Sequence, residues 1–135
     1  MSDRFFLDTA FVQALLNKRD QYHAHARAFL PRLQSADEVW VTEAILIEVG
    51  NALSALDRSA ATRFITRCYQ SVNMRVVTVD TALLLRALHL YGERNDKEWG
   101  LVDCISFVVM KDHELIDAVT IDRHFVQAGF NALLI

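Results

Sequence analysis

Short apolar segments alternate with longer segments of helical periodicity along the whole chain, and this alternation limits the possible folds more than any other feature. The predicted strands are Arg4–Leu7, Val39–Val41, Met74–Val79, Ile116–Ile121 and Phe130–Leu134. The predicted helices are Thr9–Asn17, His23–Gln34, Thr42–Leu56, Ala60–Ser71, Thr81–Tyr91 and Leu101–Lys111, with a short helix beginning at Asp122. Strands that alternate with helices form parallel sheets covered on both faces. We therefore expect an α/β protein.

The chain shows no sign of more than one domain. It has 135 residues, one proline and four glycines, with no linker or internal repeat, so we expect a single domain over residues 1–135. No apolar run approaches the roughly 18 residues of a membrane span, and the first ten residues lack the long apolar region of a signal peptide. We therefore predict a cytoplasmic protein without a membrane segment.

Charge and cysteine content narrow the function. The net charge of -3 argues against a domain that clamps nucleic acid through an overall basic surface. It leaves room for a local basic patch beside an acidic pocket in which a metal ion offsets the negative charge. Cys68 and Cys104 have neither CxxC nor Cys/His ligand spacing. We expect both to be reduced and structural, and we expect no zinc site.

Two acidic residues follow predicted strands. Asp8 comes directly after the first strand, and Asp122 comes directly after Ile116–Ile121. Right-handed crossovers bring the carboxyl ends of parallel strands to one edge of the sheet, where ligands bind in open α/β folds. We therefore expect both carboxylates at the same edge.

Two further acids lie inside apolar helical segments. Glu48 interrupts ILIEV, and Asp103 interrupts LVDCISF, with Ser106 three residues later on the same helical face. A buried carboxylate without a partner costs several kcal/mol or shifts its pKa. A hard cation such as Mg²⁺ or Mn²⁺ removes that cost, because it prefers carboxylate and water ligands.

Each acid also has a purely structural interpretation. Asp8 and Asp122 are suitable helix N-caps, and Asp103 is a first-turn acid favoured by the helix dipole. Glu48 is long enough to reach solvent or an arginine. A metal ligand can also cap a helix, so these alternatives stay open.

Four segments together resemble the PIN-domain family, and most closely the VapC-like ribonucleases of toxin–antitoxin pairs and their stand-alone relatives. The segments are FFLDTAF at 5–11, ILIEVGNAL at 45–53, DKEWGLVDCISFVVM at 96–110 and AVTIDRHFVQAGF at 118–130. The resemblance extends over almost the whole chain, in the family's order and spacing. It implies a three-layer α/β/α sandwich with a central, mainly parallel sheet, and cleavage of RNA with Mg²⁺ or Mn²⁺.

The resemblance also assigns roles to individual residues. Asp8, Glu48, Asp103 and Asp122 match the family's four catalytic acids. Asp8 and Asp103 match the positions tied most directly to the metal, and Glu48 and Asp122 would act directly or through water. Thr9 and Ser106 match supporting polar positions.

The predicted function is therefore that of a metal-dependent endoribonuclease, a hydrolase of RNA phosphodiester bonds, and of the toxin of a type II toxin–antitoxin pair. Two alternatives remain: a non-catalytic PIN-fold module that binds RNA or protein, and a stand-alone RNA-processing nuclease without an antitoxin. A nuclease assay with added Mn²⁺ distinguishes the non-catalytic module from a ribonuclease. The neighbouring reading frame distinguishes a stand-alone nuclease from a toxin, because a toxin gene has an antitoxin gene beside it.

Substrate and partner contacts are less specific in the sequence. Lys97 and Arg123 flank site acids and are the best candidates to contact phosphates, although an ordinary solvated surface explains each of them more simply. Trp99 is interpreted as a loop anchor rather than a base-stacking residue. The partners implied are RNA, an antitoxin and a second copy of the chain. Apolar residues of the first two helices suit either protein partner or the core: Phe11, Leu15, Leu16, Phe29, Leu30 and Leu33.

Overall fold

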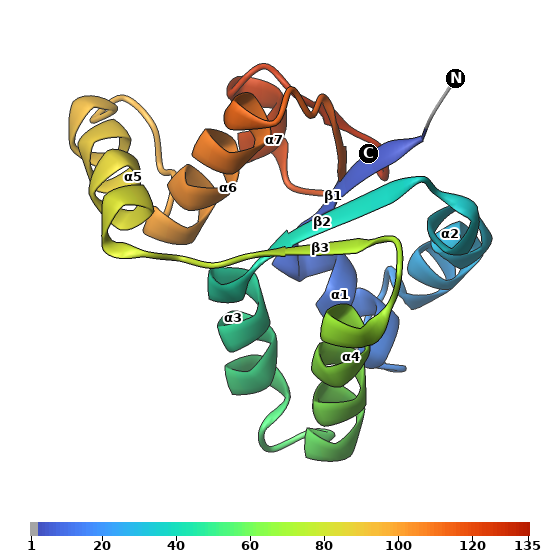
Figure 1. The fold of residues 1–135 in the computed structure, drawn as a ribbon. Coiled ribbons are helices and arrows are strands. Elements are labelled where there is room, and N and C mark those ends of the chain that lie inside the picture. Colours follow the sequence, from blue (N-terminus) through green and yellow to red (C-terminus); the bar gives the residue numbers. More distant parts are fainter. Residues whose placement is uncertain (1–2) are drawn as a thin grey trace.

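A five-stranded sheet forms the centre of the protein in the computed structural model, which describes residues 3–135 (Figure 1). The strands are β1 (Arg4–Leu7), β2 (Glu38–Thr42), β3 (Met74–Val77), β4 (Asp117–Val119) and β5 (Asn131–Ala132). Their order is β3-β2-β1-β4-β5, and all four pairings are parallel. The first strand of the chain is therefore the central one, and its Phe5 and Phe6 are fully buried.

Helices cover both faces of this sheet (Figure 1). One face carries α1 (Thr9–Leu16), α2 (His23–Ser35), α3 (Glu43–Leu53) and α4 (Arg58–Gln70). The other face carries α5 (Thr81–Glu93), α6 (Leu101–Asp112) and α7 (Arg123–Gln127). The predicted three-layer α/β/α sandwich with a parallel sheet is confirmed.

The boundaries of the strands differ from the sequence predictions. The predicted strand Ile116–Ile121 is too long, because β4 ends at Val119. The hydroxyl of Thr120 accepts the N–H of Asp122 at 3.0 Å, so the chain turns between Thr120 and Asp122. The prediction that Asp122 directly follows its strand is therefore wrong by two residues.

The two predicted edge strands are also shorter than expected, whereas β1 matches its prediction and β2 is one residue longer at each end. The strand predicted over Met74–Val79 ends at Val77, and the one predicted over Phe130–Leu134 is reduced to Asn131–Ala132. Both are edge strands with one neighbour each, so pairing stops where that neighbour ends. The helix predicted over Thr42–Leu56 begins one residue later, after Thr42 as its N-cap, and ends at Leu53.

An aromatic cluster attaches α6 and α7 to the sheet. The ring of Phe107 meets the ring of Phe125 edge to face at a centroid distance of 5.0 Å, and it meets Trp99 in the same way at 5.0 Å. Phe6 of the central strand lies 6.3 Å from Phe125. Such pairs add about 0.5–1.5 kcal/mol each beyond the area they bury. They hold α6 and α7 in a defined position relative to the end of β1.

Several local predictions are confirmed. Asp80 caps α5 by accepting the N–H of Leu83 at 2.8 Å, and Cys68 and Cys104 are free and buried. Within residues 3–135, no helix is both long and apolar enough to span a membrane.

Candidate active site

The end of β1 presents Asp8 at the carboxyl edge of the sheet. Its side chain is only 5% exposed, and its Oδ2 accepts the hydroxyl of Thr120 at 2.7 Å. Asp8 occupies the N-cap position of α1, but its side chain makes no capping hydrogen bond. The structural alternative of a plain helix cap therefore does not account for this carboxylate.

Burial raises the pKa of Asp8 from 3.8 to about 7. Loss of solvation is the largest cause, and the charges of Asp103 and Asp122 add to it. The hydrogen bond from Thr120 acts in the opposite direction. The influence of Asp103 and Asp122 places all three carboxylates within electrostatic reach of one another.

Asp103 enters from the first turn of α6, which begins after Gly100. Its Oδ2 accepts the N–H of Gly100 at 3.2 Å and lies 3.0 Å from Nδ1 of His124. This is the dipole-favoured location that one alternative predicted, yet the carboxylate also belongs to the acidic cluster. Burial raises the pKa of Asp103, against the lowering effect of these hydrogen bonds.

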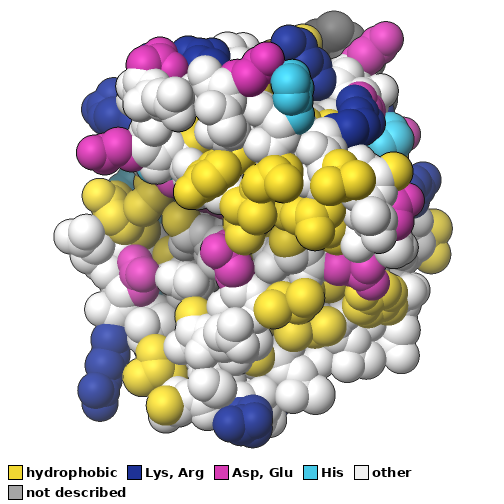
Figure 2. Space-filling view, turned by 90° about the vertical axis from the view of Figure 1, so that its left-hand side faces the viewer, with side chains coloured by type: hydrophobic (Ala, Val, Ile, Leu, Met, Phe, Trp, Pro, Cys, Tyr) yellow, Lys and Arg dark blue, Asp and Glu magenta, His cyan; other side chains and the backbone are white. Residues whose placement is uncertain are grey.

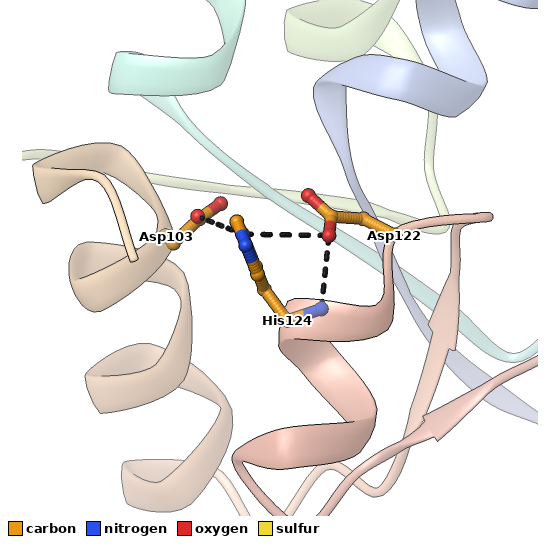
Figure 3. Close-up of side chains that lie close together, drawn as sticks. All are labelled: Asp103, Asp122 and His124. Carbon is orange, nitrogen blue, oxygen red and sulfur yellow. Dashed lines mark hydrogen bonds and ion pairs between the residues drawn. The ribbon is translucent and has the colours of Figure 1, made fainter. Parts of the chain in front are cut away.

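Asp122 and His124 complete a close group with Asp103 (Figure 3). Asp122 caps α7 by accepting the N–H of His124 at 2.9 Å, and its Oδ1 lies 3.4 Å from Nδ1 of that residue. One potential ligand atom from each of the three residues lies within 4.8 Å of the others. In Figure 3 the imidazole of His124 stands between the two carboxylates.

Glu48 reaches the same region from α3. Its Oε1 accepts the hydroxyl of Thr9 at 2.5 Å, and Thr9 directly follows Asp8. Among the described residues, no ion pair joins Glu48 to an arginine, so the arginine alternative does not account for this residue. The hydrogen bond from Thr9, the residue next to Asp8 in the chain, thus holds Glu48 at the carboxyl edge of the sheet.

A divalent cation fits the chemistry of these donors. Across residues 3–135, neither lysine nor arginine forms a salt bridge with Asp8, Glu48, Asp103 or Asp122. Asp8 is nearly inaccessible to solvent and its ionised form is disfavoured. Carboxylates in such a setting are typical ligands of Mg²⁺ and Mn²⁺. Asp103, Asp122 and His124 are close enough to hold the ion together. Asp8, which the sequence predicts as a direct ligand, lies outside that close group but is coupled electrostatically to Asp103 and Asp122, and Glu48 is linked to Asp8 through Thr9.

Two residues of the site were not identified as such from the sequence. Thr120 bridges Asp8 and the backbone of Asp122, but a threonine inside an apolar strand has no distinguishing pattern. His124 was not among the site residues predicted from the sequence. One signal in the sequence pointed to His124. It lies two residues after Asp122, a predicted helix cap, so its N–H faces the capping carboxylate.

The supporting residues behave differently from one another. Thr9 contacts Glu48 as described above, whereas Ser106 is fully buried and donates to the carbonyl of Val102 at 3.1 Å. The hydroxyl of Ser106 therefore bonds within its own helix and makes no hydrogen bond to Asp103. Arg123 is exposed beside Asp122, and Lys97 lies 3.7 Å from Asp96 in the loop before α6.

A comparison with protein families settles the affiliation of the chain. The PIN domain model matches residues 5–131. This chain belongs to the PIN-domain family. The match includes the segments of all four acids, so the resemblance found in the sequence is confirmed.

Solved structures agree with this assignment. This PIN-domain chain is similar to VapC20 of Mycobacterium tuberculosis, described as a sarcin–ricin loop cleaving toxin, with 27% identity and a TM-score of 0.83 over 94% of this chain and 96% of that one. It shares its fold with FitAcB from Neisseria gonorrhoeae, with 20% identity and a TM-score of 0.62 over 94% and 96% of the two chains.

A third structure shows the same fold at similar distance. FitAB bound to an IR36 DNA fragment has 20% identity and a TM-score of 0.64, over 95% of this chain and 92% of that one. A search of the curated proteins found no match.

Proposed function

We propose that this PIN-domain protein is a Mg²⁺- or Mn²⁺-dependent endoribonuclease of the cytoplasm and the toxin of a type II toxin–antitoxin pair. The observation that supports this most strongly is Asp8, a buried carboxylate at the carboxyl edge of the sheet, whose pKa is raised to about 7 by burial and by the charges of Asp103 and Asp122. The similarity to VapC20 extends over nearly the whole of both chains and supports RNA as the substrate.

Each residue of the chain has a defined task in this proposal. Thr120 and Gly100 orient Asp8 and Asp103 through the hydrogen bonds given above, and α7 orients Asp122 and His124. When bound, the ion supplies Lewis acidity and a water of lowered pKa for hydrolysis of the phosphodiester. The acidic side chains would attract the ion to the carboxyl edge of the sheet. The hydroxyl of Thr9 would keep Glu48 oriented toward that edge.

The test is cleavage of RNA by matched variants. Because VapC20 is described as cleaving the sarcin–ricin loop, an oligoribonucleotide of that loop is the first substrate to use, followed by a random-sequence RNA pool. We expect Asp8→Asn and Asp103→Asn to lower the rate at least about 100-fold, a loss of roughly 3 kcal/mol or more of transition-state stabilisation. Asp112→Asn, the same substitution at the other end of α6, is the control and should cleave at the wild-type rate.

The same assay separates the alternative functions. Wild-type protein that binds RNA but leaves it intact in Mg²⁺ and Mn²⁺ would favour the non-catalytic module. Titration calorimetry with Mn²⁺ gives an independent readout, because the ion should bind wild-type protein and bind Asp8→Asn at least about tenfold more weakly.

A groove on the opposite part of the molecule suits an antitoxin. It has a volume of about 590 Å³ and lies between α1, α2, α4 and the start of β3. Its apolar residues include Leu15, Leu16 and Leu30, which the core leaves half-buried, whereas Phe11, Phe29 and Leu33 are absorbed into the core.

Basic side chains also line this groove: Lys18, Arg27, Arg63 and Arg67. An apolar floor with basic walls complements an amphipathic helix that carries acidic residues. We therefore assign the groove to the antitoxin. If a small reading frame adjoins this gene, its product should bind wild-type protein and lose at least about tenfold in affinity for Arg63→Glu/Arg67→Glu, while Arg58→Glu on the same helix retains the affinity.

The resemblance also predicts a homodimer, which stays a prediction. The strands end toward the left of Figure 1, so Figure 2 shows the edge at which the acids lie, with a band of hydrophobic side chains just above acidic ones. In α5, Leu84, Leu85 and Leu88 are exposed at 39%, 58% and 47%. We propose these three leucines, in the first two turns of α5, as the contact between two copies, which leaves Tyr91 in the last turn uncovered. Sedimentation should show a dimer for the wild type and a monomer for Leu85→Glu.

A further inference from the structure

A second cavity lies next to Asp103, on the α5 side of the first turn of α6. It has a volume of about 430 Å³, within the range of roughly 300–1,000 Å³ that is usual for small-ligand pockets. Its walls come from the end of α5, the loop that follows it and the start of α6. They comprise Tyr91, Arg94, Asn95, Lys97, Glu98, Trp99, Gly100 and Cys104.

The loop that builds this cavity is held in place by its own side chains. Trp99 is only 6% exposed, and its Nε1 donates to Oε1 of Gln127 on α7 at 3.0 Å. The guanidinium of Arg94 lies 4.8 Å from the centre of the Trp99 ring and forms two hydrogen bonds to Asp96, at 3.0 and 3.1 Å. The interpretation of Trp99 as a loop anchor is therefore confirmed, and the cavity does not depend on a mobile segment.

The accessible groups of the cavity match those that recognise an unpaired nucleotide. Tyr91 is about half exposed, and Asn95 and Glu98 are exposed. Proteins read unpaired RNA bases by stacking them on aromatic rings and by hydrogen bonds to their polar edges. Lys97 provides a cation at the same place, and cations of this kind contact phosphates.

The position of the cavity connects it to the acidic site. Gly100 lines the cavity, and its N–H donates to the carboxylate of Asp103. Gly100 therefore belongs to both sites. An RNA whose phosphate lies at the acidic residues would bring a neighbouring nucleotide within reach of the cavity. Asp96 lies close to both Arg94 and Lys97 and keeps these cations directed along the loop.

We propose that this cavity is a nucleotide subsite that holds one unpaired base of the RNA next to the cleaved bond. Tyr91 stacks on the base, Asn95 and Glu98 contact its polar edge, and Lys97 contacts the adjoining phosphate. The inference rests on the proposed ribonuclease function, and it adds the residues that determine which sequence is cut.

The experiment is cleavage of a random-sequence RNA pool in Mn²⁺, with sequencing of the new ends. Asn95→Ala and Glu98→Gln should reduce the base preference at one position near the cut by about fivefold or more, and leave the other positions unchanged. Tyr91→Ala should lower kcat/KM by about tenfold, because a stacking surface is lost. Lys97→Met should raise KM for all sequences alike.

Matched controls outside the cavity are Glu93→Gln at the end of α5 and Lys111→Ala at the far end of α6. Both should retain the wild-type rate and base preference. Unchanged base preference in Asn95→Ala and Glu98→Gln, in protein that still cleaves, would overturn the subsite and leave the ribonuclease proposal intact.

If the wild type cleaves no RNA, a binding experiment tests the nucleotide subsite separately from the ribonuclease function. Wild-type protein that cleaves no RNA would reject the ribonuclease function. RNA from the same pool that stays bound to the wild type would then be sequenced. A base preference that Asn95→Ala abolishes would retain the nucleotide subsite, and one that Asn95→Ala leaves unchanged would overturn it.

Discussion

Replacing Asp8 by Asn is expected to make the metal-free protein more stable at neutral pH while it removes activity. In the folded protein the pKa of Asp8 rises from 3.8 to about 7, mainly because the carboxylate is buried. Since the folded state disfavours the ionised form, this group weakens the fold progressively as pH increases from about 4 to 7. Below pH 4 the carboxyl is neutral in both folded and unfolded chains, and this effect vanishes.

The size of the effect follows from the pKa change. The rise to about 7 corresponds to roughly 4 kcal/mol against the folded state at pH 8, as an upper limit. In Asp8→Asn the amide oxygen can still accept the hydroxyl of Thr120, but the amide N–H₂ enters a buried position. An unsatisfied donor there would cost about 1–3 kcal/mol. The net gain expected at pH 8 is therefore about 1–3 kcal/mol.

The assay is denaturant unfolding in the presence of EDTA between pH 4.5 and 8. The free energy of unfolding of the wild type should fall by about 2–3 kcal/mol more than that of Asp8→Asn over this range. Addition of Mn²⁺ at pH 8 should stabilise the wild type by mass action and leave the variant almost unaffected. Asp112→Asn, an exposed change on α6, should follow the wild type in both experiments.

The reasoning would be refuted if the two proteins showed the same pH dependence of stability. That result would mean that Asp8 ionises as easily in the folded protein as in the unfolded chain. Its burial would then not be the feature that prepares it for a cation.

Three further substitutions test the surroundings of the site. Thr120→Val should raise the pKa of Asp8 further, because it removes the hydroxyl that favours the ionised carboxylate, and the pH at which Mn²⁺ binding is half-complete should increase. His124→Gln should weaken Mn²⁺ binding in calorimetry by about tenfold if the imidazole supports the ion, and no change would remove it from the site. Trp99→Phe should lower the free energy of unfolding by about 1 kcal/mol through loss of the bond to Gln127, and an unchanged value would show that the bond contributes nothing.

The sequence predicted where Asp8 and Asp122 lie because parallel topology brings the carboxyl ends of the strands to one edge of the sheet. Once β1 and β4 are neighbours, residues that follow them lie at one edge of the sheet. The pattern of apolar segments contains this information, since strands and helices differ in periodicity. Asp8 and Asp122 could therefore be placed together before any contact was known, even though Asp122 follows its strand after two further residues.

Helix-borne members of the site were harder to place. The sequence marked Glu48 and Asp103 as unusual because each carboxylate lies in an apolar run. It did not reveal that Glu48 pairs with the hydroxyl of Thr9 or that Asp103 pairs with His124. Those contacts depend on how far each helix rotates and slides against the sheet. For Asp103 and His124, the aromatic packing of α6 and α7 fixes this position.

The cavity beside Asp103 had almost no signature in the sequence. Lys97 and Trp99 were noted one at a time, as residues of a polar loop. Only the folded chain shows that Trp99 is buried against Phe107, that Arg94 and Asp96 brace the loop, and that a hollow remains between them.

By itself the sequence determined the α/β class, because alternating periodicity is a local property of the chain. The family followed from the resemblance of four segments to PIN domains and is confirmed, whereas the roles of the four acids stay predictions. The tertiary structure decided which acid is buried, which partners orient each carboxylate, and where a nucleotide-sized cavity lies. These properties depend on solvent exclusion and on contacts between residues more than 20 positions apart, such as Thr120 with Asp8 and His124 with Asp103, and no local pattern encodes them.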